Sequence, residues 1–194
     1  MSQAQEEDRS LKREDIRHVR RIVTGEDAEG RSYIVSDGPA QNLALPNHSP
    51  TVAQVLWATG DNIAPGDDPA APDHRFGFHS ANGTILRIAD FPPDETYDPA
   101  KVATFLDEHK VRDKGKPRHF WFHVTPTLDY AIVLEGEIYA MLDQDETLMR
   151  QGDVLIQRAT NHSWSNRSGK TCRMAFVLIH GEKAGDIPAV AGHD

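Results

Sequence analysis

The chain has 194 residues, with 21 basic and 30 acidic side chains and a net charge of −9. That length predicts one domain large enough to bury its own core, and the negative charge opposes binding to nucleic acid or to a membrane of anionic lipid. The chain has one cysteine, a polar N-terminal stretch without a secretory signal, and no apolar run long enough to span a membrane. We therefore expect a cytoplasmic protein without a disulfide.

The first third of the chain carries strand signals and one long loop. Two runs of β-branched and aromatic residues, 21–24 and 32–36, flank a Gly-containing turn and predict a hairpin. Residues 51–58 predict another strand, whereas 59–82 are rich in Pro, Gly, Asp and Asn and have no periodicity. Loops of this length in compact domains are functional covers or disordered segments, and we interpret this one as a cover over the rest of the fold.

The middle of the chain predicts one strand and one helix. Residues 84–91 alternate between apolar and polar side chains until Pro92 stops the run. In 99–110, Pro99 suits a first helical turn, and apolar residues recur at helical spacing. We therefore expect a short amphipathic helix inserted between strands.

After residue 118 the sequence alternates almost continuously, with short turns that contain glycine. Short, evenly spaced strands with turns between them are typical of a β-sandwich or a closed barrel. The pattern predicts strands at about 119–125, 129–134, 137–142, 146–150, 153–157, 162–166 and 171–179.

Two motifs in this run resemble the two motifs of the cupin superfamily. In the first, two histidines one residue apart precede a glutamate and a glycine-bearing turn; here it reads H-V-T-P-T-L-D-Y-A-I-V-L-E-G, from His123 to Gly136. The second opens with a glycine and ends in a histidine followed by an asparagine; here it runs from Gly152 through His162 to Asn166. The resemblance implies a mainly β fold, a jelly-roll barrel also described as a double-stranded β-helix.

The resemblance covers roughly residues 80–181 and divides the chain. We expect the cupin barrel at 84–181, with the short helix inserted in it, and a strand and loop extension at 17–83 that packs on the barrel. Residues 1–16 are charged and predict a mobile tail. The small and polar residues 182–194 predict a C-terminal tail over the surface.

The resemblance also implies a divalent metal, which cupins hold with three histidines and one glutamate. In this chain the second histidine of the first motif falls at Thr125 and the glutamate at Asp129, which leaves His123, Asp129 and His162 as metal ligands. Two histidines and one carboxylate hold many non-haem irons, and catalytic zinc also takes three protein ligands. We therefore expect Fe(II) or Zn(II). The alternative is a hydrogen-bonded histidine pair, with Asp129 as a general base of raised pKa.

Three further residues are candidates for binding a substrate. Arg87 lies mid-strand among apolar neighbours, and it holds an anionic substrate if it points into the barrel or meets solvent if it points outward. Thr125 and Trp164 share strand parity with the predicted ligands, so we expect them to line the pocket, although an indole is also a common core residue. His119 is a back-up ligand, and Cys172 is interpreted as structural.

The resemblance implies a small metal-dependent enzyme of dioxygenase, decarboxylase, isomerase or lyase type that acts on a small organic metabolite inside the barrel. The alternative is a metal-free cupin that binds a small molecule without catalysis, and a structural or storage role is a third hypothesis. We also expect a homodimer, because the strand extension has edges that need covering and cupins often dimerise by exchanging N-terminal strands.

Overall fold

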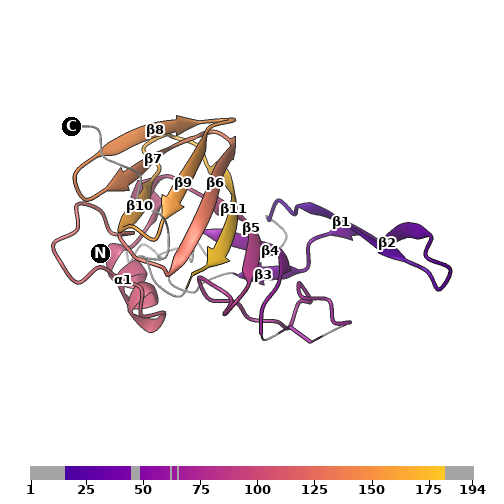
Figure 1. Cartoon of the computed structure of the whole chain (residues 1–194). Helices are drawn as coiled ribbons and strands as arrows, with labels where there is room; N and C mark the ends of the chain where they lie inside the picture. The colour runs from indigo at the N-terminus through magenta and orange to yellow at the C-terminus, as the bar shows by residue number, and fades with distance from the viewer. Residues whose placement is uncertain (1–15, 45–48, 62, 65, 182–194) are drawn as a thin grey trace, which may run out of the picture.

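The computed structural model describes residues 16–44, 49–61, 63–64 and 66–181. Its strands form a barrel of two sheets and a separate hairpin, with one α-helix outside the barrel (Figure 1). The predicted tails lie outside the described residues, apart from Ile16. Within those residues, no helix is long and apolar enough to cross a membrane.

The larger sheet has six strands in the order β3-β4-β5-β11-β6-β9, the smaller has three in the order β10-β7-β8, and β1 pairs with β2 alone. All these pairs are antiparallel. The bounds are β1 Arg20–Glu26, β2 Ser32–Pro39, β3 Asn42–Ala44, β4 Val52–Ala58, β5 Thr84–Phe91, a 3-10 turn Asp94–Thr96, α1 Pro99–Glu108, β6 Thr127–Glu135, β7 Glu137–Leu142, β8 Glu146–Arg150, β9 Val154–Arg158, β10 His162–Ser165 and β11 Cys172–His180.

The prediction of a mainly β barrel with one inserted helix is confirmed, but the strand predicted at 119–125 is wrong. That segment is irregular, and within it only His123 makes isolated bridges, to Arg112 and to His162. Pro126 has no N–H to donate to a strand ladder, and regular pairing starts at the next residue, Thr127.

The larger sheet begins before residue 84. Strand β4 pairs with β5 over most of its length, and the short strand β3, which alternation did not predict, adds the edge. The extension expected at 17–83 therefore contributes two strands to the barrel sheet itself.

Helix α1 begins and packs as its sequence predicts. The Asp98 side chain accepts a hydrogen bond from a backbone N–H of the first turn (2.9 Å), and Pro99 occupies a position whose N–H has no partner in a helix. Val102 and Leu106 are fully buried and join a cluster that includes Trp121. This cluster fixes α1 against the irregular segment that carries His123.

The long loop predicted at 59–82 has its two ends fixed to each other. Thr59 donates its N–H to the carbonyl of Thr84 (2.9 Å), and their hydroxyl oxygens are 2.9 Å apart. A Cβ at Gly83 would lie 1.8 Å from the carbonyl oxygen of Thr59, so only glycine allows this approach. No helix or strand occurs among the described residues of this loop, and its segment 75–78 lines the barrel cavity.

The β1–β2 hairpin projects away from the barrel (Figure 1). Arg21 ties its base to the loop through two hydrogen bonds to Asp68 (2.7 and 2.8 Å). An isolated two-stranded hairpin is only marginally stable in water. Four large apolar side chains of this hairpin are 50 to 59% exposed: Ile22, Tyr33, Ile34 and Val35.

Candidate functional site

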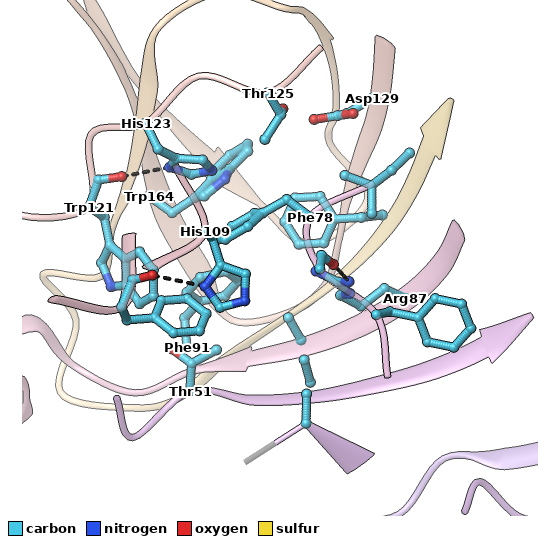
Figure 2. A pocket seen from close by; sticks show the side chains of 18 of the residues that line it. Thr51, Phe78, Arg87, Phe91, His109, Trp121, His123, Thr125, Asp129 and Trp164 are labelled. Carbon is cyan, nitrogen blue, oxygen red and sulfur yellow. Dashed lines mark hydrogen bonds between the residues drawn. The ribbon is translucent and has the colours of Figure 1, made fainter. Parts of the chain in front are cut away.

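The barrel holds a cavity of about 430 Å³ (Figure 2). It is lined by residues of the larger sheet, β10, the irregular segment before β6, the end of α1 and the long loop. All six residues that the sequence singles out line this cavity: Arg87, His123, Thr125, Asp129, His162 and Trp164.

Arg87 and Asp129 reach the cavity from the same wall. Strand β11 runs between their strands, with Phe176 opposite Arg87 and Leu178 opposite Asp129. Phe176 and Leu178 are two residues apart, so their side chains and those of their partners point to one face. Neighbouring strands are about 4.8 Å apart, which separates the two backbones by about 10 Å. The guanidinium and the carboxylate therefore project into the cavity from the same wall (Figure 2), with Phe176 and Leu178 on the strand between them.

Each of these two side chains has one buried polar atom to which no described residue forms a hydrogen bond. Arg87 donates one hydrogen bond to the carbonyl of Gly77 in the long loop. Arg87 Nε and Asp129 Oδ1, however, are buried and have no hydrogen-bond partner within the described part of the chain. Unpartnered buried polar atoms are unfavourable, so these two atoms indicate where a ligand would bind.

Burial shifts the pKa of both groups toward the neutral form. It raises the pKa of Asp129 to about 6, although a hydrogen bond from Thr127 and the charge of Arg87 oppose the shift. It lowers the pKa of Arg87 to about 10, and the charge of Asp129 opposes this change. At pH 7 most molecules therefore carry one positive and one negative charge on this wall.

Thr125 and Thr127 extend a row of hydroxyls from Asp129. Because the Thr127 hydroxyl donates to Asp129, it accepts from Thr125, whose hydroxyl oxygen is 2.8 Å away. Thr125 is only 1% exposed. This row holds the carboxylate in place and leaves Oδ1 as its free acceptor.

The two predicted histidine ligands form a close pair. The ring centroids of His123 and His162 are 4.3 Å apart, and their backbones exchange two hydrogen bonds of 2.9 and 3.1 Å. His123 Nδ1 donates to the carbonyl of Trp121 (2.7 Å), which leaves Nε2 unprotonated. Burial lowers the pKa of His123 to about 4, and burial together with the neighbouring His123 lowers that of His162 to about 3. Both imidazoles are neutral at pH 7.

Asp129 does not join the histidine pair as a third ligand. Among the residues that the structure describes, no group of three or more His, Cys, Asp or Glu side chains could hold a metal ion. Asp129 lies on the wall of β6 beside Arg87, and Thr125 stands where the family has an imidazole. The residues present therefore do not fit the predicted three-ligand site, and a metal ion stays a prediction of the sequence.

The back-up ligand, His119, lies outside the cavity. Its Nδ1 is 2.6 Å from the hydroxyl of Ser163, and its Nε2 is 3.2 Å from Asp94 Oδ2. The order Asp-His-Ser resembles a catalytic triad, but Ser163 is completely buried and does not line the cavity. We interpret this cluster as a structural link between β10 and the turn after β5.

The remaining walls are aromatic. Phe78 of the long loop packs against His123 (5.2 Å between ring centroids) and against His109 (5.4 Å), and Trp164 packs against Phe176 (5.5 Å). The sequence predicted a cover at this loop, but it singled out neither Phe78 in the loop nor His109 at the end of α1. A lone aromatic residue in an aperiodic loop gives no pattern from which its role follows.

Neutral buried histidines predict a loss of stability in acid. Between pH 7 and 5 the unfolded chain protonates His123 and His162, whereas the folded chain does not until its pKa values near 4 and 3. The folded state partly compensates, because Asp129 takes up its proton near pH 6. The unfolded chain therefore binds about one proton more than the folded chain, and the free energy of unfolding falls by about 1.4 kcal/mol for each pH unit of acidification. Urea unfolding at pH 7, 6 and 5 measures the slope. It should be shallower in His162→Gln, and a stability independent of pH over this range would contradict the assignment.

The comparisons with known proteins agree with the fold. The chain is 45% identical over 182 residues to phomopsin biosynthesis cluster protein C' of Diaporthe leptostromiformis, covering 85% of this chain and 80% of that protein. It is 29% identical over 174 residues to the cupin-domain-containing oxidoreductase fogC of Aspergillus ruber, covering 84% and 73%. No family model matches the chain.

Among solved structures, the comparison also finds a cupin 2 conserved barrel domain protein from Salinispora arenicola. It is 15% identical, the match covers 75% of this chain and 86% of that one, and the TM-score is 0.38. With its jelly-roll barrel, its two motifs and these relatives, the chain belongs to the cupin superfamily.

Proposed function

We propose that this protein is an enzyme of isomerase or lyase type, which moves a proton on a small carbonyl compound bound in the barrel cavity. The observation that carries the proposal is the pair of buried, unpartnered atoms, Asp129 Oδ1 and Arg87 Nε, on one wall of an aromatic cavity. A carboxylate of raised pKa is a suitable general base near neutral pH. A fixed N–H donor stabilises negative charge that develops on an oxygen.

The two side chains have complementary roles in such a reaction. Asp129 takes a proton from the carbon next to the carbonyl, and the electrons of that C–H bond move to the carbonyl oxygen, where Arg87 Nε–H stabilises the enolate. Return of the proton to another carbon gives an isomer, and loss of a leaving group from the next carbon gives an elimination product. Phe78 and the other aromatic walls limit the access of water to the enolate.

The relatives support a role in the synthesis of a small natural product. Two relatives that are 45% identical to the chain carry names from phomopsin biosynthesis. A cavity of about 430 Å³ is in the size range of small-molecule sites. We therefore propose a biosynthetic intermediate as the substrate.

Deuterium exchange tests the proposal without knowledge of that substrate. The probe is 2-acetonaphthone, a flat methyl ketone, incubated with the full-length protein in D₂O at neutral pH. We expect the NMR signal of its methyl protons to disappear faster than with heat-denatured protein. Equal rates would contradict the proposal. If the ketone then still binds, the protein acts as a metal-free binding cupin without catalysis.

A metal-dependent oxidoreductase is the second candidate function. It is favoured by the histidine pair, whose two neutral imidazoles lie 4.3 Å apart, and by the names of several relatives that are 25 to 29% identical. Fe(II) or Zn(II) would need a third ligand beyond His123 and His162, which the described residues do not supply. The metal content of the purified protein distinguishes the two candidates.

We further propose that the protein is a homodimer in which the projecting hairpin packs on a second copy. The exposed apolar side chains of the hairpin need a cover, and the outer face of β6 and β9 also exposes apolar side chains, among them Val154 (56%) and Ile156 (52%). We expect a light-scattering mass of twice 21.6 kDa at micromolar concentration. Ile34→Asp should give monomers and Ser36→Asp should not; a monomeric wild type would contradict the proposal.

A further inference from the structure

Three alanines form one row across the outer strands of the larger sheet. Ala44 on β3 is paired with Ala53 on β4, and Ala53 is paired with Ala89 on β5. All three side chains line the cavity. Because neighbouring strands are about 4.8 Å apart, the row extends about 10 Å from β5 to the edge strand β3. We call this row the alanine groove.

Longer side chains stand on both sides of the groove. On β5, Arg87 and Phe91 are two residues before and after Ala89, and all three line the cavity from one face of the strand. Figure 2 shows Phe91 and Thr51 on one side of the view and Arg87 on the other. The hydroxyl oxygen of Thr51 is 2.8 Å from that of Tyr97, so this hydroxyl already has a partner. The groove is therefore one residue wide and has an apolar floor.

The groove and the Asp129 carboxylate lie at different ends of the cavity. Asp129 is level with Ile85 of β5, because both are paired with Leu178 of β11. Ile85 is four residues from Ala89, which corresponds to about 13 Å along the strand. Arg87 lies between the two ends on the same strand. A ligand that contacts both Asp129 and the groove must therefore be elongated.

Each end of the cavity requires a different kind of group. Asp129 is 3% exposed, and its Oδ1 has no hydrogen-bond partner among the described residues. The same holds for Arg87 Nε, two residues from Ala89. A polar head group therefore fits this part of the cavity. The methyl groups of the groove form no hydrogen bonds, so only an apolar group gains from contact with them.

We infer that the alanine groove holds an unbranched apolar chain of the substrate, and that its alanines are specificity-determining residues. The chain leaves a carbonyl head group near Arg87 and runs across β5, β4 and β3. The inference rests on the proposed function for this head group. It concerns binding, however, and requires no turnover.

Three methyl ketones test the inference by ligand-observed NMR titration of the full-length protein. 2-Pentanone has a short chain, 2-octanone has a long one, and cyclohexyl methyl ketone has as many carbon atoms as 2-octanone in a compact form. Burial of each methylene group is worth about fourfold in affinity. We expect 2-octanone to bind at least about tenfold more tightly than 2-pentanone, and also more tightly than the cyclohexyl ketone. Absence of 2-octanone binding, or equal affinity for 2-octanone and the cyclohexyl ketone, would overturn the inference.

Leucine substitutions assign the chain to the groove. Ala89→Leu should weaken 2-octanone binding about tenfold and change 2-pentanone binding less than about twofold, because only the long chain reaches the added side chain. Ala53→Leu, at a less buried position, should act in the same direction, and the exposed Ala28→Leu is the matched control. Unchanged 2-octanone affinity in both groove variants, with thermal melting showing that they are folded, would overturn the inference. Deuterium exchange of 2-acetonaphthone is measured separately, so the two proposals can fail independently.

Discussion

Asp129→Asn is expected to slow the deuterium exchange of 2-acetonaphthone by about 10²- to 10⁴-fold, the usual contribution of a general base. The amide has nearly the same shape as the carboxylate but cannot accept the proton. In the wild type the rate should rise with pH and reach half its maximum near the Asp129 pKa of about 6, because only the ionised carboxylate is a base. Initial rates by NMR between pH 5 and 8 measure both effects, and an unchanged rate in the variant would contradict the role of Asp129.

Folding stability provides the control for this substitution. The raised pKa of Asp129 means that its ionised form destabilises the folded state, by about 2 to 3 kcal/mol once the pH is well above 6. Asp129→Asn should therefore be more stable than the wild type at pH 8, while the two converge near pH 3, where the carboxyl is mostly neutral in both states. A variant that exchanges deuterium more slowly than the wild type, and is also more stable, has lost the general base and kept its fold. The exposed Asp145→Asn should change neither quantity.

Thr125→His is expected to convert the cavity into a metal site. Thr125 lines the cavity two residues after His123, at the position where cupins carry the second histidine of their first motif. A third imidazole beside the histidine pair would complete a three-ligand set that the described residues of the wild type lack. After reloading with Fe(II) or Zn(II), we expect about one ion per chain in the variant and little metal in the wild type.

The controls separate an imidazole effect from a change in size. Thr125→Gln fills similar space without an imidazole and should remain free of metal. Adding His162→Ala to Thr125→His should remove the ion again, since two ligands then remain. If the wild type itself retains a full equivalent of metal, the metal-dependent function is favoured over the proton-transfer function, and Asp129 then approaches the histidines in solution.

The sequence predicted the parts of this fold that depend on local pattern. Alternation located β5 to the residue and β7 and β8 as well, because each strand has a glycine next to one end and a proline or an Asp-containing turn at the other. It failed at 119–125, where aromatic and β-branched residues are frequent although Pro126 blocks the ladder. Here the adjacent residues Trp121 and Phe122 both pack into the interior from an irregular segment.

The sequence predicted which residues line the candidate site, but it did not predict how they are arranged in space. Strand parity placed His123, Thr125 and Asp129 in one cavity, and the structure agrees. Parity gives the face of a strand, however, and not the distance between residues on different strands. The placement of Arg87 and Asp129 on one wall depends on β11 lying between β5 and β6, which is a property of the topology that no local motif contains.

The hydrogen bonds that join the two ends of the long loop make substrate selection by the loop independent of the chemistry carried by the barrel. Thr59 and Thr84 hydrogen-bond to each other where the two ends of the loop meet, and Gly83 permits the close approach of these two segments. Because each doubling of a loop costs only about 0.6 kcal/mol in closure entropy, the segment between these residues can change in length and composition without moving β4 or β5. The loop is thus an exchangeable module: a graft at its two threonines would replace Phe78 and its neighbours while Arg87 and Asp129 stay in register on the sheet.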